Sequence, residues 1–225
     1  MLQSLERLCK EKEGTESVTS VGGVESIVII DAMVIVQKIA PKPSWVKTAE
    51  DISKIFLDQV DFASRKASEI HLVFGTYKDG SLKQNTRTIR KGGQKPINFR
   101  IEDKTNIQKI SMTKFLSSER TKQSLTEYLT KKAIDHFEKK PSLKFLVSAN
   151  GEAVGNIDCY RSNNHEEGDT LLVWHAILAV SLHEPDDEMY IHSPDTDVLV
   201  ILVSFADRLL KKTMLSMSPR KKHLS

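Results

Sequence analysis

Two apolar segments within residues 165–203 each begin with a cluster of acidic residues. The motif HEEGDT precedes LLVWHAILAV, a run long and apolar enough to predict a buried helix. The short run at 189–193 predicts a strand, and PDTD follows it directly. In α/β proteins, ligands bind beyond the carboxyl ends of parallel strands. Acids gathered there can share one metal ion, so the stretch predicts a candidate metal site.

Helix capping is the alternative interpretation of these acids. Aspartate and glutamate are favoured in the first turn of any helix, where they face unpaired N–H groups and the positive end of the helix dipole. Ser193 followed by Pro194 is itself a typical helix start. Two acidic pairs spaced i, i+2 favour a site over capping alone: Glu167 with Asp169, and Asp195 with Asp197.

The rest of the chain alternates between strand-like and helical patterns. Strands are predicted at 24–31, 69–74 and 143–148, and helical spacing of apolar residues predicts helices at 48–67, 107–140 and 198–210. Such alternation predicts an α/β fold whose central sheet is mainly parallel and flanked by helices on both faces. Turn formers fill 149–164, and the basic tail from 211 onward is expected to be low in order.

Asp31 closes the first predicted strand and is a third acidic position at a strand's carboxyl end. A turn or cap role is the alternative for this residue. His175 lies inside the apolar run, where a histidine is more often a satisfied core residue than a ligand.

The segment 75–96 is rich in lysine and arginine and has almost no large apolar residues. It cannot bury itself, so we expect an exposed loop or short helix. Beside a metal site it could neutralise the phosphates of a nucleic-acid strand. The alternative is an ordinary solvated loop.

Composition sets broad limits on the class of protein. A length of 225 residues suits one domain, which we place at 24–225 after an extension at 1–23. The formal charge of +3 is too mild to diagnose nucleic-acid binding. Two distant cysteines indicate neither a disulfide framework nor a cysteine zinc site. Without a membrane-spanning run or secretory segment, we expect an intracellular protein, nuclear or cytoplasmic, with no membrane partner.

The motifs HEEGDT and SPDTDVLVIL resemble those of the PIN-like nuclease superfamily, in its flap-endonuclease branch. A transposon-associated animal group in that branch carries HEEADT-like and SPDTDVLVLL-like motifs. The resemblance is traceable over 28–203 and implies a PIN-like three-layer sandwich.

The resemblance also implies an activity, namely hydrolysis of phosphodiester bonds in DNA or RNA with bound Mg²⁺ or Mn²⁺. The matching metal-binding and catalytic positions are Asp31, Glu167, Asp169, Asp195 and Asp197. The basic segment is similar to the family's arch, which contacts the nucleic-acid backbone. Its candidate residues here are Lys83, Arg87 and Arg90.

Two departures from the family pattern bear on activity. Gly75 stands where family members carry an aspartate, and the chain ends at Ser225, before a further acidic motif. We therefore expect a domain truncated at its C-terminal end, with nuclease activity that is impaired. Gly168 replaces the usual alanine, at about 1 kcal/mol of helix propensity if it lies inside the turn. The alternative is a catalytically inactive domain that binds nucleic acid or another protein.

Overall fold

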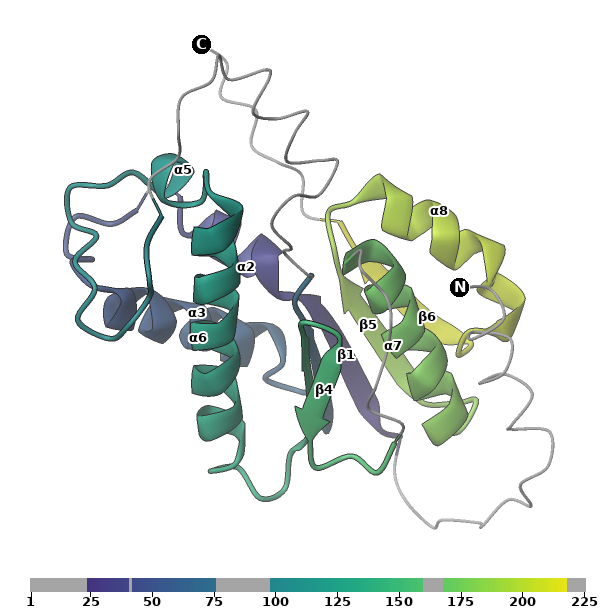
Figure 1. The fold of residues 1–225 in the computed structure, drawn as a ribbon. Helices are drawn as coiled ribbons and strands as arrows, with labels where there is room; N and C mark the ends of the chain where they lie inside the picture. Colours follow the sequence, from purple (N-terminus) through teal and green to yellow (C-terminus); the bar gives the residue numbers. More distant parts are fainter. Residues whose placement is uncertain (1–23, 41, 76–97, 160–167, 218–225) are drawn as a thin grey trace.

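A six-stranded sheet forms the centre of the molecule, in the strand order β4-β3-β2-β1-β5-β6 (Figure 1). The computed structural model describes residues 24–40, 42–75, 98–159 and 168–217. Neighbouring strands are parallel except for β3 and β4, which are antiparallel. The strands are β1 (Ser26–Asp31), β2 (Glu69–Val73), β3 (Lys144–Ala149), β4 (Glu152–Gly155), β5 (Glu188–His192) and β6 (Lys212–Ser216).

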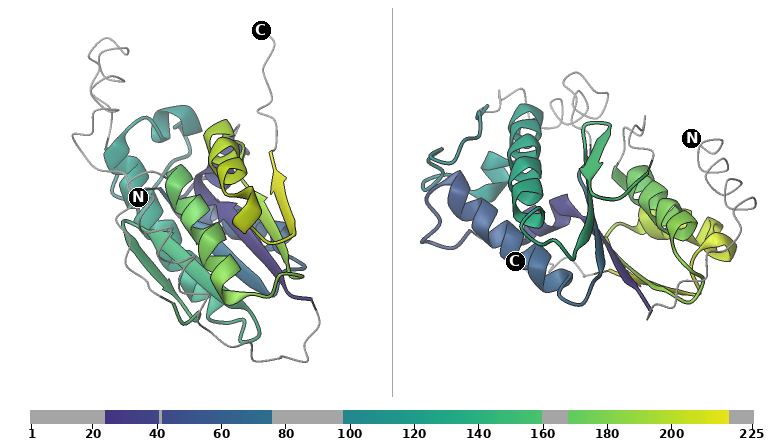
Figure 2. Two further views of the ribbon diagram at one scale, coloured as in Figure 1. Left: turned by 90° about the vertical axis from the view of Figure 1, so that its right-hand side faces the viewer. Right: turned by 90° about the horizontal axis from the view of Figure 1, so that it is seen from below.

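Helices cover the sheet on both faces, as the two further views show (Figure 2). The first face carries α2 (Ala32–Lys38), α3 (Ala49–Ala63), α5 (Met112–Phe115) and α6 (Glu119–Phe137). The second face carries α7 (Gly168–Leu182), α8 (Thr196–Ser204) and the 3₁₀ turn Ala206–Arg208. The predicted α/β class, with a mainly parallel sheet between two helical layers, is confirmed.

The central strand β1 is buried on both faces, which explains its unbroken β-branched sequence. Val28 and Ile30 pack with the first helical layer, whereas Ile27 and Ile29 pack with α7 and α8. Parallel strands covered on both sides have near-continuous apolar sequences of this kind.

Local signals define α3 and α7 well. Thr48 and Asp51 form a reciprocal capping box at the start of α3, and its apolar side faces the sheet. In α7 all nine residues from 171 to 179 are buried, which confirms the prediction of a buried helix. None of the helices within the described ranges reaches the length and apolarity of a transmembrane span.

The region 107–140 is two helices, where one was predicted. Ser111 caps α5 and Ser118 caps α6, each by accepting a backbone N–H. These serines start new helices because their side chains satisfy otherwise unpaired donors. The strand β4 was also missed: it follows a tight turn in which Asn150 and Gly151 have φ values of 53° and 86°.

The end of the chain differs from the prediction in two ways. The expected buried helix at 198–210 stops at Ser204 and buries only Val198 and Leu202, while Val200 remains 68% exposed. Part of the tail expected to be low in order forms β6, which is parallel to β5. Pairing with a strand already in the sheet supplies hydrogen bonds that the local sequence does not reveal.

Candidate acidic metal centre

Asp31 lies at the carboxyl end of the central strand β1, next to Val73 of β2. Its Oδ1 accepts hydrogen bonds from the backbone N–H groups of Met33 (2.9 Å) and Val34 (3.4 Å). Asp31 is therefore the N-cap of α2, as its alternative interpretation predicted. The cap also fixes the position of its carboxylate at the rim of the sheet.

Asp195 and Asp197 follow β5, the other neighbour of β1. Oδ1 of Asp195 accepts the backbone N–H of Asp197 at 3.0 Å, which makes Asp195 the N-cap of α8. The predicted helix start at Ser193 and Pro194 was therefore wrong. Instead, Oγ of Ser193 accepts the N–H of Asp195 at 3.2 Å and holds the approach to the helix.

The first turn of α7 brings Asp169 to the same place. One carboxylate oxygen from each of Asp169, Asp195 and Asp197 lies within 4.8 Å of the other two. Two helices that are distant in sequence thus present three acids to one point. Three oxygen ligands so close together suit a hard divalent cation.

Asp31 is not a member of this group of three acids, but two of its members affect the pKa of its carboxylate. Burial raises its pKa from 3.8 to about 6, against the lowering effect of the hydrogen bonds from Met33 and Val34. The negative charges of Asp169 and Asp195 contribute to the same rise in pKa. Within the described ranges no ion pair involves Asp31, Asp195 or Asp197. The rim is accordingly a site of crowded negative charge.

Four of the five predicted acids therefore lie at one rim of the sheet. Glu167, the fifth, lies outside the described residues, as do the basic candidates Lys83, Arg87 and Arg90. Their predicted roles stay predictions.

Gly75 lies two residues beyond the end of β2, against the first residue of α7. A Cβ atom at position 75 would stand 3.6 Å from the Cα of Gly168, an ordinary contact distance. Position 75 is therefore next to the turn that carries Asp169. An acid here would join the rim, and the glycine leaves the rim without it.

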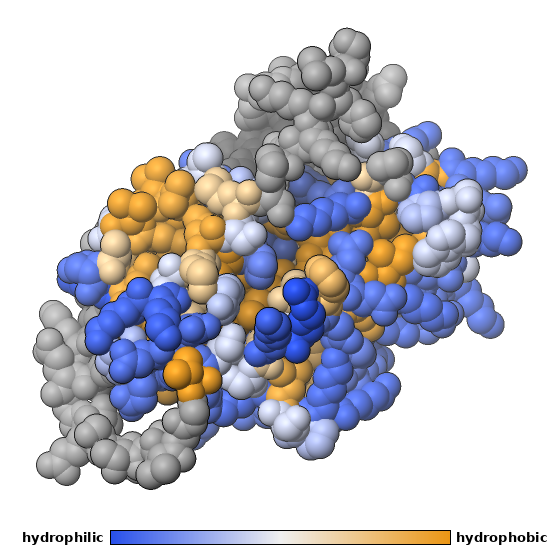
Figure 3. Space-filling model, turned by 180° about the vertical axis from the view of Figure 1, so that it is seen from behind, coloured by the Kyte–Doolittle hydropathy of each residue, from blue (hydrophilic) through white to orange (hydrophobic). Residues whose placement is uncertain are grey.

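A groove of about 930 Å³ opens on the first face of the sheet, between α3 and β5, and reaches Asp31. Figure 3 views the molecule from this side, with apolar surface in orange between hydrophilic areas in blue. Exposed aromatic residues line the groove: Trp45 is 57% and Phe62 is 69% exposed. The guanidinium of Arg65 lies 4.4 Å from the ring centre of Phe62.

A second group, which was not predicted, consists of Glu25, Glu69 and His183, whose ligand atoms also lie within 4.8 Å of one another. Glu25 precedes β1, Glu69 begins β2 and His183 follows α7. The group therefore lies at the amino ends of the strands, whereas Asp31 lies at a carboxyl end. No motif connects these residues in the sequence. His175, predicted as a core residue, is buried and hydrogen-bonded to Ser148 (2.8 Å), which confirms that prediction.

Comparison of the chain with family models, with curated proteins and with solved structures found no match.

Proposed function

We propose that the chain is a nuclease domain that hydrolyses phosphodiester bonds of DNA or RNA with bound Mg²⁺ or Mn²⁺. The observation that carries the proposal is the convergence of Asp169, Asp195 and Asp197 within 4.8 Å, beside the electrostatically coupled Asp31. These acids come from three separate segments that end or begin at one rim of a parallel sheet. Ligands of α/β proteins bind at such rims.

The donor set fits Mg²⁺ or Mn²⁺, because hard cations take carboxylate oxygens. When bound, such ions activate a water molecule and stabilise the leaving oxygen of a phosphodiester. Backbone N–H groups on Oδ1 of Asp31 and Asp195 fix those two carboxylates before any ion arrives. Burial and the neighbouring acids raise the pKa of Asp31 to about 6, and a cation at the rim would lower that pKa because it favours the ionised form.

The groove that reaches Asp31 supports a nucleic-acid substrate with an unpaired strand. Exposed Trp45 and Phe62, with Arg65 against the Phe62 ring, offer flat surfaces on which bases can stack. Stacking tolerates every base, because each one has a π face. The groove also carries Asp58 and Glu188 beside Lys38 and Arg65, so stacking contributes more to this part of the proposal than net charge does.

A cleavage assay with matched variants tests the proposal. Labelled single-stranded, flap and duplex substrates are incubated with the purified chain and Mg²⁺ or Mn²⁺. Asp195→Asn and Asp197→Asn remove ligand charge, and asparagine can still cap α8. We expect each variant to lose at least about 100-fold of the cleavage rate, because metal positioning depends on these groups. Asp135→Asn, at an exposed site on α6, is the control that should keep full activity.

Gly75 favours a second candidate, a domain that binds nucleic acid without cleaving it. This alternative predicts binding that weakens steeply with salt and is unchanged by a chelator, together with no cleavage above the Asp195→Asn background. A protein-interaction domain, in which the acids are caps only, predicts neither nucleic-acid binding nor a rise in melting temperature on adding Mn²⁺.

A further inference from the structure

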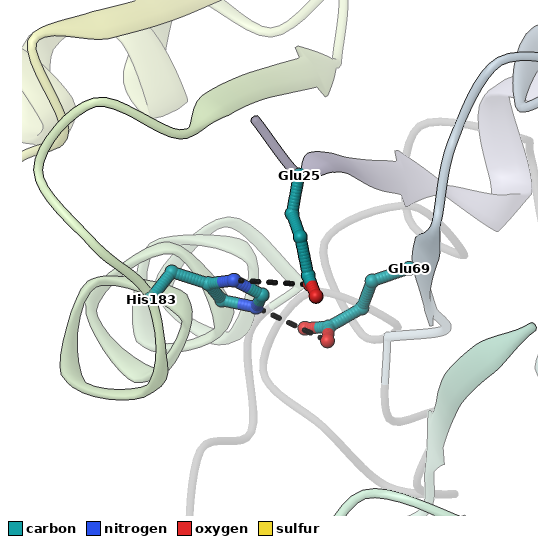
Figure 4. A group of neighbouring side chains, drawn as sticks. All are labelled: Glu25, Glu69 and His183. Carbon is teal, nitrogen blue, oxygen red and sulfur yellow. Dashed lines mark ion pairs between the residues drawn. The ribbon is translucent and has the colours of Figure 1, made fainter. Parts of the chain in front are cut away.

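His183 lies directly after α7, with only 5% of its side chain exposed, and faces three carboxylates. Its Nε2 is 3.1 Å from Oε2 of Glu69, and a dashed line in Figure 4 marks this ion pair. Its Nδ1 is 3.4 Å from Oδ2 of Asp187 and 3.6 Å from Oε2 of Glu25. Both ring nitrogens are thus directed at acids from different parts of the chain.

We propose that this cluster is a binding site for a zinc-class transition-metal ion. The ligands are Nδ1 of His183 and one carboxylate oxygen each from Glu25 and Asp187. Glu69 lies outside this set and orients the imidazole. The site lies at the amino ends of the strands, away from Asp31, and does not depend on the proposed nuclease function.

The separations around Nδ1 match those between ligands of one metal ion. Neutral and charged N–H···O hydrogen bonds span about 2.7–3.2 Å between heavy atoms. The values of 3.4 Å and 3.6 Å at Nδ1 are longer. Two ligand atoms bound to tetrahedral zinc at about 2.0–2.2 Å lie roughly 3.3–3.6 Å apart. The distances from Nδ1 to these two oxygens are therefore compatible with an ion bound beside the imidazole.

Glu69 has the position of an outer carboxylate in a carboxylate–histidine–metal arrangement. Its Oε2 contacts Nε2 of His183, the ring nitrogen that faces away from the ion, and its Oε1 is 2.8 Å from Nε2 of His71. When Nε2 of His183 carries its proton toward Glu69, Nδ1 presents a lone pair to the ion. Glu69 is buried, so its orientation is fixed by these two histidines.

The local charges balance when a divalent ion is present. Glu25, Glu69 and Asp187 supply three negative charges, and Nζ of Lys144, at 2.9 Å from Glu25, supplies one positive charge. A divalent ion beside a neutral imidazole brings the sum to zero. Nζ of Lys144 also donates to Oε1 of Glu25 at 3.1 Å, and this hydrogen bond can persist while Oε2 binds the ion.

The ligand type distinguishes this site from the acidic rim. An imidazole nitrogen with carboxylates suits Zn²⁺ or Co²⁺, whereas a set of carboxylates alone suits Mg²⁺ or Mn²⁺. Asp187 is preorganised for the task, because its two oxygens accept the backbone N–H groups of Glu25 (2.8 Å) and Glu184 (3.0 Å).

The test is a titration of the full chain, freed of metal, with Zn²⁺ and with Co²⁺. We expect one zinc ion per chain at this site and a visible Co²⁺ spectrum of tetrahedral type. His183→Gln and the more exposed Glu25→Gln should both lose the spectrum, and Glu69→Gln should weaken zinc binding about 10–100-fold. His136→Gln is the matched control, because His136 lies beside one acid, Asp61, and one lysine, Lys140.

Failure of the zinc site and failure of the nuclease proposal are separable. Asp197→Asn should leave zinc binding unchanged, whatever it does to cleavage. Folded wild-type protein that binds no Zn²⁺ would show that the cluster is an ion-pair network alone and would overturn the proposal. A Co²⁺ spectrum that persists in Glu25→Gln and His183→Gln, or one with thiolate bands from a cysteine, would overturn it as well.

Discussion

Replacing Asp31 by asparagine should stabilise the folded chain at neutral pH and have almost no effect at acidic pH. Asparagine caps a helix about as well as aspartate does, so the hydrogen bonds from Met33 and Val34 can persist. The substitution removes a carboxylate that burial and the charges of Asp169 and Asp195 make unfavourable. The substitution therefore measures the cost of burying a carboxylate at this position, to which the charges of Asp169 and Asp195 add.

The magnitude follows from the pKa of Asp31, which rises from 3.8 to about 6 on folding. Below pH 3.8 the group is protonated in both states and contributes no difference. As the pH rises toward 6 the unfolded chain releases the proton first, so the folded state of the wild type loses stability. The full loss is roughly 3 kcal/mol, at about 1.4 kcal/mol for each pH unit between the two pKa values. Asp31 keeps partial contact with solvent, so we expect Asp31→Asn to gain about 1–3 kcal/mol above pH 7.

Urea unfolding of both proteins between pH 4 and pH 8, in the presence of a chelator, measures this difference. Asp135→Asn, which removes an exposed carboxylate on α6, controls for the change in net charge. A stability difference between Asp31→Asn and wild type that does not widen between pH 4 and pH 8 would refute the raised pKa of Asp31. Adding Mn²⁺ should stabilise the wild type and narrow the difference, because a bound cation compensates the carboxylate.

Three further predictions concern single positions. Gly155→Ala should lower the free energy of unfolding in urea by roughly 1–3 kcal/mol, because the added Cβ would lie 2.0 Å from the carbonyl oxygen of Phe145. Stability equal to wild type would contradict the tight pairing of β3 and β4. Gly75→Asp should fold normally and bind Mn²⁺ more tightly in calorimetry, because it adds a carboxylate beside Gly168; unchanged affinity would place position 75 outside the metal pocket. Glu69→Gln in metal-free protein should lower the free energy of unfolding by about 3–5 kcal/mol, because it removes the buried acid between His71 and His183. A decrease below about 1 kcal/mol would argue against an ion-pair network of Glu69 with the two histidines.

Much of the secondary structure could be predicted because its signals are local. The β-branched sequence of β1, the helical spacing of α3 and the apolar run of α7 each depend on a few neighbouring residues. The order of these elements was enough to predict a mainly parallel sheet with helices on both faces. The acids at the starts of α7 and α8 could be singled out in the same way, because their spacing lies within a single turn.

The failed predictions concern elements whose stability comes from distant partners. The strand β6 has few features of a strand by itself and forms by pairing with β5. The strand β4 likewise depends on its pairing with β3, and α8 leaves Val200 and Val203 exposed where an apolar run predicted burial. In each case the environment of the segment, which local periodicity does not encode, decides its structure.

The sequence by itself determined the central strands and the buried helix α7, and therefore which acids could lie at a strand's carboxyl end. Only the tertiary structure decided that Asp31, Asp169 and Asp195 act on one another, and that His183 meets Glu25 and Glu69 at the amino ends of the strands. The physical reason is that the periodicity of apolar residues indicates which side of one element is buried. A metal site, in contrast, depends on which separate elements lie next to each other. That arrangement is set by the packing of the whole chain.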